Sequence, residues 1–226
     1  MSEVIIGVLG ADGRMGQALI ATISNNENCS SISASKDDEL DQFFSHADIA
    51  IDFTAPEALN AHLTHAIATK TPLVIGTTGL SDAQFEAIKQ ASKHIAIVQA
   101  ANMSVGVSVL MGAVKSAAKT LGDDFKIEIT DKHHVHKKDA PSGTALAFEK
   151  AIHDGREDDK NIEYFITREG EIAGEHRISF KNDSEEVSFT HKAYDRKIFA
   201  KGAVRAALWL RRKPAGLYSI EDVLGL

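Results

Sequence analysis

Short apolar runs alternate with segments of helical periodicity over the first hundred residues of the chain. Val4–Leu9 is almost entirely apolar and predicts a buried strand, and the apolar residues after it recur at helical spacing as far as Ile23. The same alternation predicts strands at 31–35, 48–53, 73–75 and 95–98, and helices at 56–70 and 81–92. Strands that alternate with helices indicate a parallel sheet covered by helices on both faces.

The pattern changes near residue 104. A long helix of small and apolar residues is expected at 105–121, and the remaining segments indicate a strand at 125–130, a helix at 142–152, strands near 164–168, 177–180 and 187–191, and a helix at 203–210. This order predicts an α+β domain with a mixed or antiparallel sheet. We therefore expect one domain at 1–104 plus 197–226 and a second domain at 105–196.

The bulk composition narrows the classes of function. The chain has 226 residues, 43% of them hydrophobic, and a formal charge of −7, so a nucleic-acid partner has no bulk electrostatic support. Its one cysteine, Cys29, excludes an internal disulfide, lies in a polar, turn-like stretch and is expected to be inert. The N-terminal residues lack the regions of a signal peptide, and no apolar run approaches the length of a membrane span. We expect a cytoplasmic protein with no nucleic-acid or membrane partner.

A glycine-rich turn follows the first predicted strand and opens the first predicted helix. Its glycines have the spacing G-x-x-G-x-x-G, and Asp12 stands where a dinucleotide fingerprint usually has its second glycine. Glycines permit a tight turn and the close approach of a pyrophosphate, and the helix N-terminus supplies N–H donors. The turn predicts a Rossmann-like dinucleotide-binding domain whose cofactor contacts include Gly10, Ala11, Asp12, Gly13, Arg14 and Met15. A glycine-rich turn without a ligand is the alternative interpretation.

The second predicted strand ends where such folds bind the adenosine ribose. Lys36, with Arg14, could hold a 2′-phosphate and favour NADPH, whereas Asp37 could hold the ribose hydroxyls and favour NADH. A solvated charged turn is the alternative for each residue, so we expect both cofactors to be used. Two further turns end predicted parallel strands, and the cofactor contacts expected there are Gly76, Thr77, Thr78, Ala100, Ala101, Asn102 and Met103.

Histidines and lysines gather in the segment 131–145, directly before a predicted helix start. Such a segment combines proton donors, fixed positive charge and backbone N–H groups, which suits a small anionic substrate that is protonated during the reaction. The N–H groups of Ser142, Gly143 and Thr144 are expected to be free for that anion. A metal site formed by His133, His134 and His136 is the alternative, but the neighbouring lysines disfavour a cation and we expect no metal. Lys132, His136 and Lys138 are expected to be solvated, and Asp139 to hold the loop through backbone bonds.

The sequence HHxxKxDxPSGTA at 133–145 closely resembles the signature of the 4-hydroxy-tetrahydrodipicolinate (dihydrodipicolinate) reductase family. Weaker matches follow the family's order along nearly the whole chain, at 10–16, 52–54, 76–79, 101–107 and 202–205. The resemblance implies NAD(P)H-dependent reduction of 4-hydroxy-tetrahydrodipicolinate, via dihydrodipicolinate, to tetrahydrodipicolinate in lysine and diaminopimelate biosynthesis. It also implies a small dicarboxylate substrate, NADPH or NADH as cofactor, and a homotetramer.

The resemblance assigns roles to individual positions. His133 and Lys137 match the family's catalytic histidine and lysine, and His134, Gly143 and Thr144 match its substrate contacts. Arg196 and Phe199 match a C-terminal segment that returns to the nucleotide domain. Another NAD(P)-dependent reductase of a small acid, and a non-catalytic dinucleotide sensor, are the competing hypotheses.

This chain departs from the family pattern in two ways. Asp131 stands where the family usually has a glutamate, and the shorter carboxylate is expected to alter how His133 is oriented. The chain is also shorter than many members, with residues missing near 38–44 and before Arg168, in segments that the sequence indicates as loops.

Overall fold

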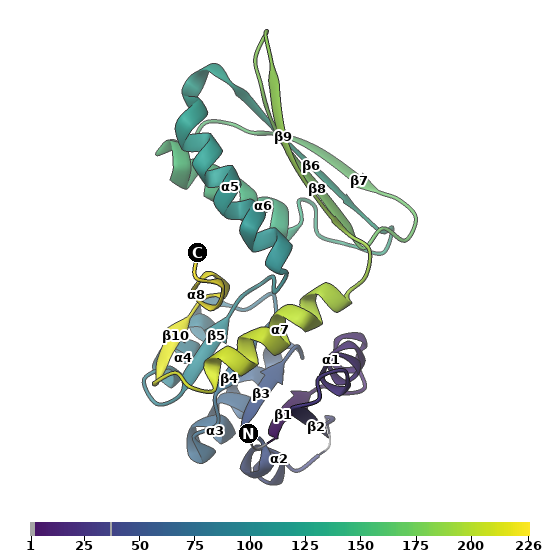
Figure 1. The fold of residues 1–226 in the computed structure, drawn as a ribbon, viewed down its shortest axis with the longest axis vertical. Helices are drawn as coiled ribbons and strands as arrows, with labels where there is room; N and C mark the ends of the chain where they lie inside the picture. The colour runs from purple at the N-terminus through teal and green to yellow at the C-terminus, as the bar shows by residue number, and fades with distance from the viewer. Residues whose placement is uncertain (1–2, 37) are drawn as a thin grey trace. The chain divides into compact units, whose positions relative to one another are not determined.

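The computed structural model describes residues 3–36 and 38–226, which divide into two compact units. The first unit runs to Ser104 and includes Lys197–Leu226, and the second unit is Val105–Arg196 (Figure 1). None of the helices in the described part of the chain is long and apolar enough to cross a membrane.

The first unit is built on a six-stranded sheet of order β10-β5-β4-β3-β1-β2, in which every neighbouring pair is parallel. Its strands are β1 (Val4–Leu9), β2 (Cys29–Ala34), β3 (Ile49–Asp52), β4 (Leu73–Ile75), β5 (Ala96–Gln99) and β10 (Gly216–Tyr218). Its helices are α1 (Arg14–Ser24), α2 (Leu40–His46), α3 (Leu59–Thr69, after a 3-10 turn at Pro56–Ala58), α4 (Asp82–Ala91), α7 (Lys197–Leu210) and α8 (Ile220–Leu224). The predicted Rossmann-like α/β fold is confirmed.

Alternate residues of the central strands enter two separate apolar layers. Ile49 and Ile51 of β3 belong to the layer that includes side chains of α1 and α7, whereas Ala50 belongs to the layer that includes side chains of α2, α3 and α4. Because helices cover both faces, β3 is buried along its whole length and β1 along nearly all of it. This burial is the reason that these strands read as apolar runs in the sequence.

Local details of the first unit differ from the prediction where the sequence signal is short. β2 begins at Cys29, so this residue is buried at a strand end instead of lying in a turn, and burial raises the pKa of its thiol. α2 occupies the stretch that the sequence indicated as a loop, and it buries only Phe43 and Phe44. The short elements β10 and α8 were not predicted. The capping box of Ser81 and Gln84 at the start of α4 is confirmed.

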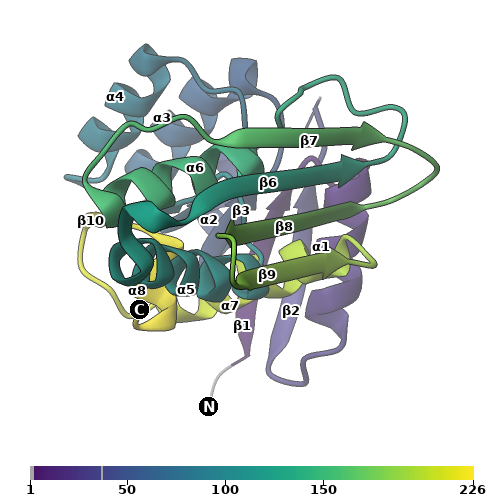
Figure 2. The ribbon, with the colours of Figure 1, turned by 90° about the horizontal axis from the view of Figure 1, so that it is seen from above.

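The second unit is a four-stranded sheet of order β7-β6-β8-β9 with two long helices on one face (Figure 2). Its elements are α5 (Val105–Leu121), a 3-10 turn at Gly122–Asp124, β6 (Lys126–His133), α6 (Gly143–Arg156), β7 (Glu163–Arg168), β8 (Gly174–Lys181) and β9 (Glu186–Ala193). β6 pairs in parallel with β7, and the other pairs are antiparallel, so the sheet is mixed.

Strand β6 places the polar segment at the edge of the apolar core. Burial alternates along this strand, so Ile127, Ile129, Asp131 and His133 face the helices in succession. β6 extends three residues beyond the predicted 125–130, which corrects the expectation that His133 lies in a loop. A strand position restricts the backbone of this histidine more than a loop position does.

Candidate active site

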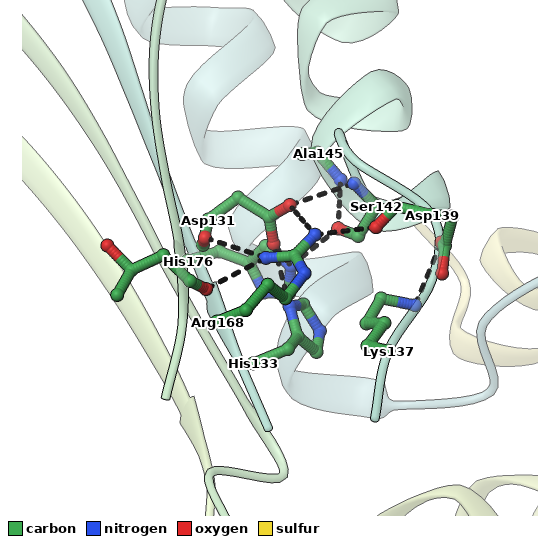
Figure 3. A network of polar contacts seen from close by, with 9 residues as sticks. Asp131, His133, Lys137, Asp139, Ser142, Ala145, Arg168 and His176 are labelled. Atoms are coloured by element: carbon green, nitrogen blue, oxygen red, sulfur yellow. Dashed lines mark hydrogen bonds and ion pairs between the residues drawn. The ribbon is translucent and has the colours of Figure 1, made fainter. Parts of the chain in front are cut away.

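Asp131 and His133 lie two residues apart on the same face of β6. The carboxylate of Asp131 has no solvent exposure, and its Oδ1 lies 2.8 Å from Nδ1 of the buried His133 (Figure 3). The shorter side chain of aspartate thus reaches the histidine because the strand places both side chains on one face. A Cβ on Gly174 would lie 3.1 Å from Nε2 of His133, so this glycine leaves room beside the ring.

Three further groups hold the same carboxylate. Oδ2 of Asp131 accepts hydrogen bonds from the N–H of Ser142 at 2.8 Å and from Nη2 of Arg168 at 3.1 Å. Nε2 of His176 lies 3.4 Å from Oδ1. The sheet register explains this convergence, because His176 stands opposite Asp131 on β8 and Arg168 stands opposite His133 on β7.

These contacts keep Asp131 ionised. Burial by itself would raise the pKa of Asp131, but the imidazoles of His133 and His176 and the hydrogen bonds from Ser142 and Arg168 outweigh it and hold the pKa well below its usual range. The carboxylate is therefore a permanent acceptor that fixes its donors in place.

Ser142 serves the protein's own network through both its backbone and its side chain. It is the N-cap of α6, and its hydroxyl accepts from the N–H of Ala145. Its own N–H donates to Asp131, which corrects the expectation that this group is free for a substrate anion. The hydroxyl of Ser142 also lies 3.1 Å from Nε2 of His176.

Arg168 and Asp139 fix the loop that carries Lys137. Arg168 donates from Nη1 to the backbone carbonyl of Asp131 at 3.1 Å and from Nη2 to that of Asp139 at 2.6 Å. Nζ of Lys137 lies 2.8 Å from Oδ2 of Asp139 (Figure 3). Burial would raise the pKa of Asp139, but Lys137 and the N–H groups of Asp139 and Gly143 lower it overall. Asp139 thus holds the loop through backbone bonds as expected and also pairs with Lys137, which was not expected.

The remaining basic side chains of the segment are less enclosed. His134 is half-buried, and burial followed by the positive charge of Arg196 lowers its pKa. His136 and Lys138 are exposed, whereas Lys132 is half-buried.

The structure gathers a different set of metal-ligand types from the one the sequence suggested. Asp131, His133 and His176 each offer a ligand atom within 4.8 Å of the others, in place of the three sequential histidines. The guanidinium of Arg168 lies 3.1 Å from the same carboxylate. A fixed positive charge at that distance disfavours a cation.

The glycine turn of the first unit has the geometry that a dinucleotide needs. Gly10 has a φ of 70°, and a Cβ on Gly16 would lie only 2.3 Å from the Gly10 carbonyl oxygen, so both positions require glycine. The N–H groups of Gly10 and Ala11 donate to Ala34 at the end of β2, which fixes the turn against that strand. α1 begins at Arg14, so its first N–H groups point into the turn. The residues present therefore fit a pyrophosphate.

Other predicted cofactor residues lie at the carboxyl ends of the parallel strands. Thr77 is buried and its hydroxyl lies 3.2 Å from Oδ1 of Asp52, which is itself paired with His62. Exposed positions among the predicted contacts are Asp12, Gly13, Arg14, Lys36, Thr78 and Ala101. Partly buried ones are Met15, Ala100 and Asn102, and fully buried ones are Ala11, Gly76 and Met103.

The cofactor residues predicted at positions 103, 196 and 199 do not share one location. Met103 packs into the apolar core of the first unit, and its backbone carbonyl lies against Gly202 of α7, where a Cβ would be 1.7 Å from the oxygen. Phe199 packs against the same core on α7, while Arg196 ends the second unit. Asp37 lies outside the described residues.

Sequence reasoning missed Arg168, His176 and Gly174 as parts of the site. They belong to the segment 168–176, for which the sequence indicates only a shortened loop before Arg168. The cross-strand register brings them to Asp131 and His133, and no local spacing in the sequence reports a register.

A parallel nucleotide-binding sheet with this glycine turn, joined in one chain to a unit bearing a polar histidine and lysine site, defines an NAD(P)-dependent oxidoreductase. Family models described as dihydrodipicolinate reductase, N-terminus and C-terminus, match residues 4–103 and 106–224. The chain belongs to the dihydrodipicolinate reductase family.

Individual relatives agree with the family models. The chain is 41% identical to the 4-hydroxy-tetrahydrodipicolinate reductase of Pseudoalteromonas translucida over the full length of both, and 42% identical to that of Sulfurimonas denitrificans over 98% of this chain and 99% of the relative. The first alignment extends over 266 positions, so the relative has residues that this 226-residue chain lacks. The fold resembles a dipicolinate-bound dihydrodipicolinate reductase from a Paenisporosarcina species, with a TM-score of 0.83, 22% identity, and coverage of 96% of this chain and 97% of that one.

Proposed function

We propose that the chain catalyses the NAD(P)H-dependent reduction of 4-hydroxy-tetrahydrodipicolinate, via dihydrodipicolinate, to tetrahydrodipicolinate in lysine and diaminopimelate biosynthesis. Family membership supports the reaction, and one structural observation carries its assignment to residues. That observation is the buried, ionised Asp131 against His133, on a strand that leads directly into the loop of Lys137.

The substrate is a ring with two carboxylates, and the second unit offers groups that suit it. The backbone N–H groups of Gly143 and Thr144 lie in the first turn of α6, where the helix favours an anion. The half-buried imidazole of His134 supplies a further polar contact. The carboxylate of Asp139 interacts with both Lys137 and the N–H of Gly143, so a substrate carboxylate in this place would compete with Asp139 for them.

When bound, the reduced nicotinamide supplies a hydride to the ring of the substrate. Electron density then builds on the ring nitrogen, and the ammonium of Lys137 is the group proposed to stabilise it and deliver the proton. The Lys137–Asp139 contact of 2.8 Å must lengthen for this transfer. His133, held through Nδ1 by Asp131, keeps its Nε2 edge for orienting the substrate or sharing the proton.

The first unit is proposed to hold the cofactor at the turn of residues 10–15 and at the strand ends 76–78 and 100–103. Lys36 and Arg14 are both exposed, and the turn is tied to the end of β2, just before Lys36. Two cations in this region favour a 2′-phosphate, so we propose that NADPH is accepted as well as NADH.

The second unit is also proposed to form the contacts of a cytoplasmic homotetramer. The sheet face opposite the helices carries Phe165, which is 46% exposed, and the ion pairs Arg177–Glu186 and Lys181–Glu128. β9 is an edge strand. An exposed sheet edge and face of this kind is usually covered in folded proteins. Light scattering at micromolar concentration tests the proposal, and a monomer would contradict it.

The reaction is tested by following NADPH and NADH oxidation at 340 nm with the product of dihydrodipicolinate synthase as substrate. Turnover with the substrate, and none without it, is the expected result. If the chain binds the cofactor and leaves it unoxidised, the dinucleotide-sensor hypothesis gains support. Oxidation with another small oxo acid alone would favour a different reductase.

A further inference from the structure

We infer that His176 is a positioning residue, which holds the shared carboxylate of Asp131 and thereby orients His133 for the reaction. This inference rests on the proposed function. His176 lies on β8 directly opposite Asp131 and is 4% exposed. Neither its position in the sequence nor the chemistry assigned to Lys137 accounts for a buried imidazole at this place.

Nε2 of His176 lies between two oxygen atoms. It is 3.4 Å from Oδ1 of Asp131 and 3.1 Å from the hydroxyl of Ser142, which accepts a hydrogen bond from the N–H of Ala145. An ionised carboxylate can only accept, so Nε2 must carry a hydrogen to interact favourably with Asp131. Nδ1 of His176 has no hydrogen-bond partner among residues 3–36 and 38–226, and the ring of Phe148 has its centroid 6.0 Å away. A hydrogen on Nε2 fits these surroundings.

His176 constrains His133 in two ways. Both imidazoles approach the same oxygen, Oδ1 of Asp131, so each limits where that oxygen can move. The two rings also pack edge to face, with centroids 5.1 Å apart and an interplanar angle of 69°. The contact between His133 and Asp131 is short but not aligned as a hydrogen bond, so His133 depends on its neighbours for a fixed ring direction.

The same side chain ties the proposed anion site to the proposed catalytic strand. Ser142 donates its N–H to Asp131, and its hydroxyl contacts His176, which in turn contacts Asp131. These three contacts connect β6, β8 and the start of α6. Loss of His176 therefore loosens His133 and the first turn of α6 together. The proposed role predicts a fall in kcat that exceeds any change in cofactor binding.

Two variants separate positioning from packing. His176→Leu removes the donor and fills similar volume, whereas His176→Gln keeps an N–H near the place of Nε2. We expect His176→Leu to lower kcat by about tenfold or more, the range of a misoriented proton-transfer group, with the NADPH Kd within about twofold of the wild type. His176→Gln should restore most of this loss. His153→Leu, at the far end of α6 beside Glu149 and Asp158, is the matched control.

The kinetic outcomes have separate meanings. A wild type without turnover defeats the proposed function. An active wild type with an unchanged kcat in His176→Leu, or equal kcat losses in the Leu and Gln variants, overturns the inference.

Nitrogen-15 NMR of the imidazole rings adds a readout that needs no turnover and no substitution. The wild type should show His176 with hydrogen on Nε2 and His133 with hydrogen on Nδ1. In His176→Leu the His133 signals should move toward a mixture of tautomers. A wild-type His176 with hydrogen on Nδ1 would contradict the inference even where the Leu variant fails to fold.

Discussion

Each unit of the chain contains a buried aspartate in contact with a buried histidine, and the contact distance is nearly the same in the two pairs. Oδ2 of Asp52 lies 2.7 Å from Nδ1 of His62 in the first unit, and Oδ1 of Asp131 lies 2.8 Å from Nδ1 of His133 in the second. Both carboxylates have no solvent exposure. The contact distance and the burial of the carboxylate do not distinguish the two pairs.

The other donors distinguish the two networks. The carboxylate of Asp52 also accepts hydrogen bonds from neutral groups, which are the N–H and hydroxyl of Thr54 and the hydroxyl of Thr77. Its contact with His62 is aligned as a hydrogen bond. Asp131 instead receives a guanidinium, a second imidazole and the N–H of a helix cap, from three other elements. Its contact to His133 is not aligned. In the first network the carboxylate and the histidine are joined by an aligned hydrogen bond. In the second, Nδ1 of His133 has no aligned hydrogen bond among the residues that the structure describes, so its ring can still reorient when a ligand binds.

The largest expected effect separates the chemistry of the second unit from the binding role of the first. Lys137→Ala should lower kcat by about 10²- to 10⁴-fold, the range for loss of a general acid, while the NADPH Kd stays near that of the wild type. Steady-state kinetics and cofactor fluorescence titration measure the two quantities. Lys138→Ala, at the exposed neighbouring lysine, is the control and should keep its kcat. A wild-type kcat in Lys137→Ala would remove the assignment.

A stability measurement sharpens the description of the first network. Asp52→Asn should lower the free energy of unfolding by about 2 kcal/mol or more, because it weakens the buried hydrogen bonds that His62, Thr54 and Thr77 make to a charged acceptor. The matched control is Asp41→Asn, since Asp41 Oδ1 also lies 2.7 Å from an imidazole nitrogen, that of His65, but its side chain is 85% exposed. The control should lose about 1 kcal/mol or less in urea unfolding. Equal losses of unfolding free energy in the two variants would show that burial does not determine how much the Asp52–His62 contact stabilises the fold.

Acid should weaken both networks together. The pKa of Asp52 is lowered because His62 and Thr54 outweigh burial, and that of Asp131 is lowered by His133, His176, Ser142 and Arg168, which together outweigh burial. A carboxyl with a lowered folded pKa stabilises the protein above its unfolded pKa of about 4, and this contribution is lost as the pH falls further. Urea unfolding between about pH 6 and pH 3 should show a falling stability whose slope is shallower in Asp52→Asn and in Asp131→Asn. An unchanged slope in both variants would contradict these shifts.

The smallest effect concerns cofactor choice at the exposed end of β2. Lys36→Ala should raise the KM for NADPH by about tenfold, or about 1.4 kcal/mol, and leave the KM for NADH nearly unchanged. Lys70→Ala, an exposed lysine after α3, is the control. Equal changes for both cofactors would refute contact between Lys36 and a 2′-phosphate.

The sequence predicted the parts of the fold that have strong local patterns. The bounds of β1, β4 and α5 agree with the structure, because continuous apolar runs and a long helical period mark them. α2, β10 and α8 have three to seven residues and too few buried positions to form such a pattern. The mixed or antiparallel sheet predicted for the second unit is mixed, and composition does not reveal that β7 is the strand that pairs in parallel with β6.

The site was predictable only as far as its members are close in sequence. His133, Lys137 and the start of α6 lie on one segment with a specific spacing, so they were identified together. Arg168 and His176 reach Asp131 through the register of β7 and β8, which depends on packing of the whole sheet. The hydrogen bond from the Ser142 N–H to Asp131 also depends on this tertiary packing and could not be predicted from local spacing.

The most direct test of the contrast between the two networks is single-turnover hydride transfer in Asp131→Asn with saturating NADPH. The amide keeps the volume of the carboxylate but is uncharged and has only one oxygen, so it cannot accept both from the two imidazoles at Oδ1 and from Ser142 and Arg168 at Oδ2. We predict that the rate per cofactor-binding site falls by about tenfold or more, with an NADPH Kd close to that of the wild type. A transfer rate equal to that of the wild type would show that the Asp131 network only stabilises the fold, as the Asp52 network is argued to do.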